Sequence, residues 1–280
     1  MGSACDTGKL DVMRRSHLSS ALVLFASLST CVARGQSAPE LPAEQAALFD
    51  RIRAASYHPG KIGLSCEGAL DFTALLAKMG GATNTDGAKA LEGLRLQLTT
   101  GATGPTSITF TWPGGKFPAE VKAQLEVGAR QMLEGFSQVY WPIANADVLP
   151  VGKDQPAVVG TLDGGFAITT QGGAKRLTIS RDSLIQQVDA KDSQGQITVT
   201  RASYTAAKDA KPGDPVRLSG LDIDQGSGPT RVHEVITWDN QDVAGAHVPH
   251  RINVSLPGLF DLAATLSNCS IAWGTVTPAK

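Results

Sequence analysis

Residues 158–201 read VVGTLDGGFAITTQGGAKRLTISRDSLIQQVDAKDSQGQITVTR, and this stretch decides the fold. Short runs rich in Val, Ile and Thr alternate with turns such as Asp163-Gly164 and Gly172-Gly173. Apolar β-forming runs bounded by Gly, Asp and Ser are typical of strands joined by tight turns. The strands predicted here are Val158–Leu162, Gly165–Thr170, Ala174–Ser180, Leu184–Asp189 and Gln196–Arg201.

The same pattern continues toward the C-terminus. Gln194-Gly195, Gly226–Gly228 and Pro257-Gly258 supply further turn signals. Strands that recur about every ten residues, without helices between them, favour a sandwich or barrel over a strand–helix–strand fold. The additional strands predicted are Val216–Asp222, Arg231–Trp238, Pro249–Ser255 and Leu262–Asn268.

The helices are predicted in the N-terminal half. Apolar residues recur at helical spacing in Pro42–Ala55, in Asp71–Met79 and in the longest segment, Pro118–Tyr140. Gly128 and Gly135 either weaken this longest helix or let it pack closely, and Trp141-Pro142 is expected to end it. Three short strands lie between the helices, the last two as a hairpin: Lys61–Glu67, Leu94–Leu98 and Ser107–Trp112.

These elements predict an α+β fold. An antiparallel β-meander, curved into a half-barrel and capped by the helices of the N-terminal half, would bury the apolar helix faces against the sheet. The sequence shows no internal repeat and no linker, so residues 38–280 are predicted to form a single extracytoplasmic domain.

Residues 1–37 are interpreted as an upstream extension and a signal peptide. Arg14 and Arg15 precede Leu18–Thr30, which is apolar and uncharged over 13 residues. A signal core has about 7–15 such residues, whereas a membrane-spanning helix needs about 20. Met13 is then the expected start, and cleavage is expected to leave a new N-terminus between Val32 and Pro39, at the small residues Ala33, Gly35 and Ala38.

An alternative is a lipoprotein anchored through Cys31. Leu28-Ser29-Thr30-Cys31 resembles a lipoprotein box, although Thr30 stands where Gly, Ala or Ser is usual. Either reading places the protein outside the cytoplasm, in the periplasm or secreted. The chain is 42% hydrophobic and 18% charged, and loss of the first 35 residues leaves 21 basic against 24 acidic residues. Nucleic acid is therefore not an expected partner, because no basic surface remains to neutralise phosphates.

Two cysteines remain after export, Cys66 and Cys269. In an oxidising compartment an even number of cysteines favours disulfides, and two cysteines allow one intramolecular connection. Because both lie in predicted strands, one early and one last, a Cys66–Cys269 disulfide would join the ends of the sheet. The alternative is two separate buried thiols that pack as small apolar side chains.

A family resemblance lies in the second half of the chain. Lys175–Ser180 and Gln187–Thr200 are similar to the successive hairpins of LolA/LolB-like lipoprotein carriers, and His247–Val254 resembles a strand near the end of such proteins. The resemblance is one of pattern and implies a half-open barrel capped by helices. It further implies a concave apolar face that holds lipid or lipoprotein acyl chains without covalent chemistry or a cofactor, and peripheral or lipid-anchored association with a membrane.

Aromatic residues are the candidates for a ligand-binding lining: Trp112, Phe136, Tyr140, Trp141 and Trp238. The alternative is that they are ordinary core or helix-packing residues. The leading hypothesis is an envelope protein that binds or carries a lipid or another apolar molecule, which predicts an apolar concavity. The alternatives are a structural or protein-interaction domain with a filled core, and a hydrolase whose site is a cleft of clustered polar groups.

Metal binding and catalysis have little support in the sequence. His247 and His250 flank Pro249 in a predicted strand and should face opposite ways, whereas a zinc site needs converging ligands. Asp222 and Asp224 share a strand face but precede a Gly-rich turn, which indicates a solvated strand end. No nucleophile elbow, phosphate loop or dinucleotide fingerprint occurs, so neither a catalytic residue nor a metal ligand is assigned.

Overall fold

The computed structural model describes residues 43–72, 91, 93–100, 106–113, 119–150, 157–226, 228, 231–258 and 260–274. All of them belong to one compact unit, Ser37–Lys280. The predicted signal peptide, the lipoprotein box and residues 73–79 of the predicted helix Asp71–Met79 lie outside the described residues. Within the described part, no helix is both long and apolar enough to cross a membrane.

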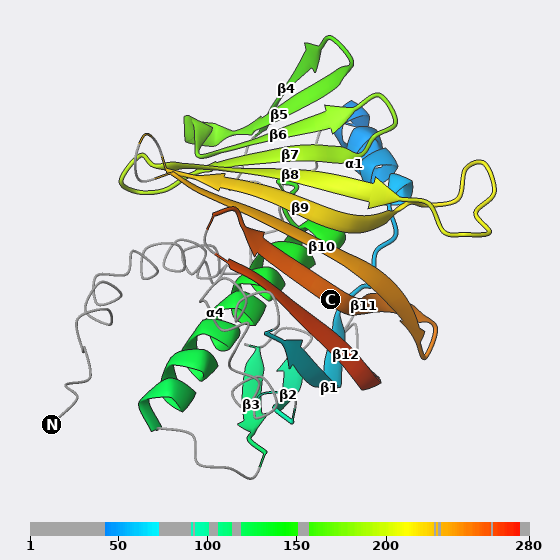
Figure 1. Cartoon of the computed structure of the whole chain (residues 1–280). Coiled ribbons are helices and arrows are strands. Elements are labelled where there is room, and N and C mark those ends of the chain that lie inside the picture. Colours follow the sequence, from blue (N-terminus) through cyan, green and yellow to red (C-terminus); the bar gives the residue numbers. More distant parts are fainter. Residues whose placement is uncertain are drawn as a thin grey trace, which may run out of the picture. The chain divides into compact units, whose positions relative to one another are not determined.

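Twelve strands of the described part form one antiparallel sheet (Figure 1). The order is β3-β2-β1-β12-β11-β10-β9-β8-β7-β6-β5-β4. From β4 to β12 each strand pairs with the next in sequence, and β1 then pairs with β12 and brings β2 and β3 with it. The strands are β1 (Ile62–Asp71), β2 (Arg95–Thr100), β3 (Ser107–Thr111), β4 (Ala157–Leu162), β5 (Gly165–Thr170), β6 (Lys175–Ser180), β7 (Ile185–Lys191), β8 (Ile197–Thr205), β9 (Arg217–Gln225), β10 (Val232–Val243), β11 (Ala246–Leu256) and β12 (Phe260–Trp273).

Alternation along the strands gives the sheet one apolar face, called here the inner face. In β2 the inner residues Leu96 and Leu98 are buried, while the residues between them are exposed. Neighbouring strands add inner residues in register, such as Ile252 of β11 opposite Trp238 of β10. The period of two therefore determines which side chains form the core and which remain on the outer face.

Two helices lie among the described elements: α1 (Ala43–Ala55) and α4 (Ala119–Ala144). α1 buries Leu48, Phe49 and Ile52, the one helical face that the sequence pattern predicts. His58, just after α1, connects the two helices: Nδ1 lies 2.5 Å from the Ala144 carbonyl oxygen and Nε2 lies 2.5 Å from the Arg53 carbonyl oxygen. Both partners are carbonyl oxygens, so the imidazole ring bridges the ends of the two helices.

The predicted disulfide is present. Cys66 in β1 is bonded to Cys269 in β12, and their Cα atoms are 4.1 Å apart. The register between the two strands shifts next to Cys66. Asn268, on the opposite strand, has a left-handed backbone conformation with a φ of 48° at this irregularity. The bond therefore ties the first strand to the last, as the sequence predicts.

The predicted α+β class and the antiparallel meander are confirmed. β10 and β12 each extend five residues past their predicted ends, and two predicted helix boundaries are wrong. β1 continues to Asp71, so Asp71 does not begin a helix. α4 continues through Trp141 and Pro142 to Ala144. Pro142 stands in the last turn, where it lacks the N–H for one helical hydrogen bond, and the helix ends two residues after it. The sheet is open, and its curvature into a half-barrel stays a prediction.

Candidate functional site

Aromatic side chains of α4 gather around Trp238 on the inner face of β10. The ring centroids of Phe136 and Tyr140 lie 5.2 Å and 5.3 Å from that of Trp238, both close to edge-to-face. Phe136 and Tyr140 also stack on each other at 5.1 Å, and Trp141 approaches Tyr140 at 4.8 Å. These spacings and angles are the ones that aromatic pairs prefer. Four of the five candidate residues thus meet in one place, called here the aromatic cluster.

The fifth candidate, Trp112, lies apart from the aromatic cluster. It follows β3, and its indole nitrogen donates a hydrogen bond of 2.5 Å to Glu126 of α4. The Lys122 ammonium stands 5.3 Å from its ring, a cation–π contact. Trp112 therefore attaches the first half of α4 to the edge of the sheet. A ligand-lining role for any of the five residues stays a prediction.

The aromatic cluster is closely packed. Phe136, Tyr140 and Trp238 are 6%, 3% and 5% exposed. Burial, with a smaller effect of Tyr57, raises the pKa of Tyr140 above its ordinary value and keeps its hydroxyl neutral. A ligand that used these rings would therefore have to displace part of α4.

The indole N–H of Trp238 is buried and has no nitrogen or oxygen acceptor among the described residues. Tyr140 stands nearly perpendicular to the indole, at 86°. A buried donor without an acceptor costs about 1–3 kcal/mol, and a contact with an aromatic face recovers only part of this. The cluster thus contains one polar group that its protein neighbours do not satisfy.

α4 is weaker than its length of 26 residues suggests. No heavy atom lies within 4 Å of a Cβ placed at Gly128 or Gly135, so neither glycine allows close packing. Each glycine costs roughly 1 kcal/mol relative to alanine in a helix interior. Val127 beside them is 53% exposed. Of the two roles that the sequence leaves open for these glycines, the structure favours the weakening of α4.

A carboxyl group stands on the inner face near the aromatic cluster. Glu234 lies four residues before Trp238 in β10, on the same face as Ile236. Burial raises the pKa of Glu234, since the charged carboxylate loses hydration there. Burial lowers the pKa of Lys175, which lies two residues from the buried Leu177 on the inner face of β6. The inner face therefore carries polar groups at its margin.

A charged network occupies the outer face of β8–β10, where the sequence predicts a solvated strand end. The Asp222 side chain is 41% exposed, as predicted, whereas Asp224 is 8% exposed, so the prediction is wrong for Asp224. Its Oδ1 accepts hydrogen bonds from Arg231 at 2.6 Å and 2.9 Å, and its Oδ2 accepts one from Arg201 at 2.9 Å. His233 Nδ1 stands 3.2 Å from the same Oδ1. The cross-strand register aligns Asp224 with His233, which the spacing within one strand cannot show.

These contacts lower the pKa of Asp224 from 3.8 to about 2, chiefly through the hydrogen bonds from Arg201 and Arg231. Asp222, Asp224 and His233 bring one ligand atom each within 4.8 Å of one another. Two guanidinium groups already hold the Asp224 oxygens and would repel a divalent cation. The network therefore joins strands and is a poor metal site.

The other two histidines considered have separate partners. His247 Nδ1 pairs with Asp242, and its Nε2 lies 2.7 Å from an Arg217 nitrogen. Burial and then Arg217 lower the pKa of His247. His250 Nδ1 lies 3.4 Å from Asp239. They do not converge on one point, so they do not form a joint metal site.

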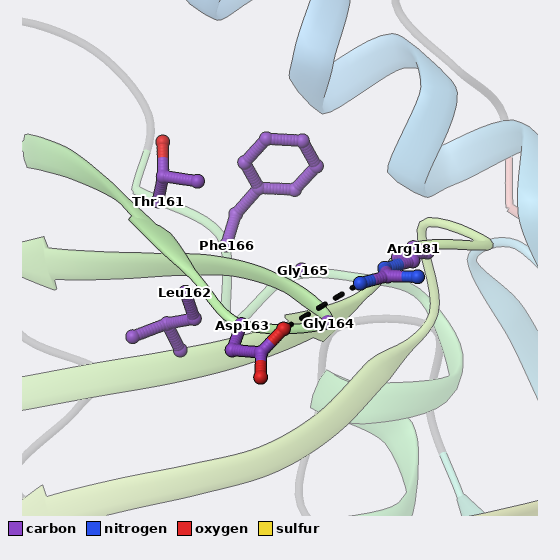
Figure 2. A pocket seen from close by; sticks show the side chains of 7 residues that line it. All are labelled: Thr161, Leu162, Asp163, Gly164, Gly165, Phe166 and Arg181. Atoms are coloured by element: carbon purple, nitrogen blue, oxygen red, sulfur yellow. Dashed lines mark ion pairs between the residues drawn. The ribbon is translucent and has the colours of Figure 1, made fainter.

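The linings of two hollows on the surface of the described part contain no residue of the aromatic cluster. One, of about 320 Å³, lies between the turn from β4 to β5 and the turn after β6, where Asp163 and Arg181 point toward each other at 3.5 Å (Figure 2). The second, of about 240 Å³, lies on the outer face between Asp71, Val235, Arg251 and Asp261. Both are open and bordered by charged side chains, so neither resembles an apolar binding cavity.

Comparison with known proteins does not place the chain in a family. The described residues define an open antiparallel sheet with a helix on its apolar face. No family model matches the chain, and no curated protein matches it.

Two solved structures are similar in outline. A DUF1329 family protein from Desulfovibrio piger superposes with a TM-score of 0.25 at 11% identity, over 82% of this chain and 93% of that one. A domain named for outer membrane lipoprotein sorting, from Vibrio parahaemolyticus, superposes with a TM-score of 0.26 at 9% identity, over 83% and 94%. At this level of superposition neither likeness assigns a function to the chain.

Proposed function

We propose that this protein binds an apolar chain non-covalently between α4 and the inner face of the sheet, with α4 as the movable element. The observation that carries the proposal is the aromatic cluster around Trp238, in which a buried indole N–H has no acceptor. An amphiphile with an ester or carboxyl oxygen would give that donor a partner, while its chain replaces the rings of Phe136 and Tyr140.

The helix supports this proposal because its middle can unfold locally, and so uncover the inner face, at modest cost. Gly128 and Gly135 together weaken α4 by roughly 2 kcal/mol relative to alanine, and no close contact requires them. Separation of α4 would expose a row of inner residues on β10, with Ile236 and Trp238 as apolar contacts and Glu234 at the margin. A long apolar chain fits such a row better than a compact polar molecule does.

The polar groups of the aromatic cluster favour non-covalent binding over catalysis. The side-chain polar groups of the aromatic cluster are the Tyr140 hydroxyl and the indole N–H groups of Trp141 and Trp238, and burial keeps the hydroxyl neutral. Nucleophilic catalysis requires an activated nucleophile beside a base. We therefore propose a carrier or binding protein of the cell envelope, outside the cytoplasm, in accord with the disulfide Cys66–Cys269.

The second candidate is a structural or protein-interaction domain without a small ligand. The burial and close ring contacts of Phe136, Tyr140 and Trp238 favour it, because a filled core needs no ligand. The two candidates differ in whether α4 opens to admit a ligand.

Native mass spectrometry with added oleate separates them. The binding proposal expects one oleate per chain, and slower uptake by the Gly128→Ala/Gly135→Ala variant. Because the two alanines add roughly 2 kcal/mol to α4, uptake that requires its opening slows about 30-fold. The variant Gly160→Ala, in β4, is the control because no heavy atom lies within 4 Å of a Cβ placed there, and it should take up oleate at the wild-type rate. Absence of an oleate adduct, or equal uptake by the double variant, would favour the structural candidate.

A further inference from the structure

β4 forms one end of the sheet, and its outer edge is unpaired within the described residues. β4 and β5 are joined by the two-residue turn Asp163-Gly164, with Gly164 at a φ of 97°. In such a hairpin the flanking residues, Leu162 and Gly165, form a hydrogen-bonded pair, and bonded pairs then recur at every second residue. Ala157, Val159 and Thr161 therefore direct their backbone N–H and C=O groups away from β5.

This edge lacks the usual protection against strand pairing. Exposed edges are commonly blocked by charged side chains, by proline, by bulges or by a covering helix. The six residues of β4, AVVGTL, contain no charge and no proline, their register with β5 is regular, and Val158 is 72% exposed. At the opposite end of the sheet α4 approaches β3 through Arg130, 5.8 Å from the Phe110 ring, and through Glu126.

A hollow opens at the end of this edge. It is lined by Thr161, Phe166 and Arg181 among others, and Thr161 and Phe166 form a cross-strand pair on one face (Figure 2). The Arg181 and Asp163 side chains are largely solvated and 3.5 Å apart, so their ion pair is worth little and can exchange. A carboxylate arriving next to Asp163 would meet the Arg181 guanidinium, which is suited to bidentate binding.

The length of the β4 edge indicates whether a peptide or a second copy of the chain would pair with it. Six residues at about 3.3 Å each span about 20 Å, and with a sheet about 10 Å thick the pairing buries on the order of 400 Å² in total. A stable protein–protein interface buries about 1,200–2,000 Å². An edge of this length therefore suits a short extended peptide of a partner protein and is too small to hold a dimer of this chain.

We propose that β4 accepts an extended, acidic peptide segment of a protein partner as an added strand. The backbone of Ala157, Val159 and Thr161 supplies the hydrogen bonds, and Arg181 binds an acidic side chain of the peptide in the adjoining hollow. Main-chain pairing gives such a contact its affinity, and the hollow gives it specificity. This surface is separate from the aromatic cluster, so the proposal does not depend on the proposed function.

The test uses two synthetic hexapeptides of alternating Val and Thr that differ in one terminal residue, Glu or Lys. We expect the Glu peptide to bind at least ten times more tightly than the Lys peptide in a fluorescence anisotropy titration. Asp163→Asn should increase affinity for the Glu peptide, because Arg181 then loses its competing carboxylate. Arg181→Gln should reduce the preference for Glu over Lys to less than twofold.

Val159→Pro tests the backbone contact, since proline removes an N–H that points away from β5 and leaves the β4–β5 bonds in place. It should lower the affinity at least tenfold, whereas Val159→Ala should bind as the wild type does. Hydrogen exchange gives a readout on the unmodified chain: the peptide should protect the amides of Ala157, Val159 and Thr161. No binding of either peptide at 1 mM, unchanged exchange at these amides, or full binding by a folded Val159→Pro variant would overturn the proposal.

Discussion

Removal of the Cys66–Cys269 disulfide should destabilise the protein. The length of the loop that the bond closes sets an upper limit on the loss of stability. The bond joins residues separated by 203 positions. The chain-entropy model gives roughly 18 cal/mol/K for a loop of this length, or about 5 kcal/mol at 25 °C. Unfolding of about 240 residues carries an entropy near 0.5 kcal/mol/K, so the full effect corresponds to a Tm decrease of about 10 °C.

The observed decrease should be smaller than this limit, because β1 and β12 remain paired without the bond. We expect a decrease of about 4–10 °C, within the range measured for native disulfides. Cys66→Ser, Cys269→Ser and the double variant should give the same Tm. Reductant should lower the Tm of the wild type to that value and should leave the double variant unchanged.

Thiol labelling provides the second readout. In Cys269→Ser the remaining Cys66 is fully buried, so it should react with a thiol reagent only after unfolding, while Cys269 in Cys66→Ser should react faster. Two reactive thiols in unreduced, denatured protein isolated after export would refute the bond. An unchanged Tm in the double variant would refute the stabilising role assigned to it.

Three further changes test the helices and the charged network. His58→Ala removes both bonds between the ends of α1 and α4 and should cost about 2 kcal/mol or more, measured by urea denaturation. Gly135→Ala should raise stability by about 1 kcal/mol, and a decrease would show that the glycine is needed for packing. The lowered pKa of Asp224 contributes stability that is present above pH 3.8 and is lost as the pH falls toward about 2. Asp224→Asn should therefore flatten the loss of stability between pH 4 and 2, and an unchanged slope would contradict the network described.

The sheet could be predicted from the sequence because each strand carries its own local signal. Alternation such as that of Arg95–Thr100 and turns such as Asp163-Gly164 arise within a few residues, and the structure follows them closely. The return of β1 to β12 could be inferred only through the cysteines, since pairing across some 200 residues leaves no local pattern. The end of α4 was misplaced, because Pro142 is accommodated within the last turn and the helix ends at Ala144 rather than before Trp141.

The residues of the aromatic cluster could be predicted from the sequence, but their close packing against one another could not. The helical spacing of Phe136 and Tyr140 indicates a shared face, but it cannot show that Trp238 of a distant strand fills the space against them. The network around Asp224 was missed for a related reason. Arg201 and His233 lie on neighbouring strands, and only the register of β8, β9 and β10 brings them to one carboxylate.

The most direct test of the proposed function uses a variant in which Trp238 is the only tryptophan. Trp112, Trp141 and Trp273 are changed to Phe, and the variant is titrated with a fatty acid brominated along its acyl chain, which quenches indole fluorescence on contact. A matched variant retains only Trp273, which lies at the end of β12 and is 57% exposed. The proposal predicts saturable quenching of Trp238 at one fatty acid per chain and little quenching of Trp273. Quenching confined to Trp273, or no quenching of Trp238 at saturating fatty acid, would contradict an apolar ligand between α4 and the sheet.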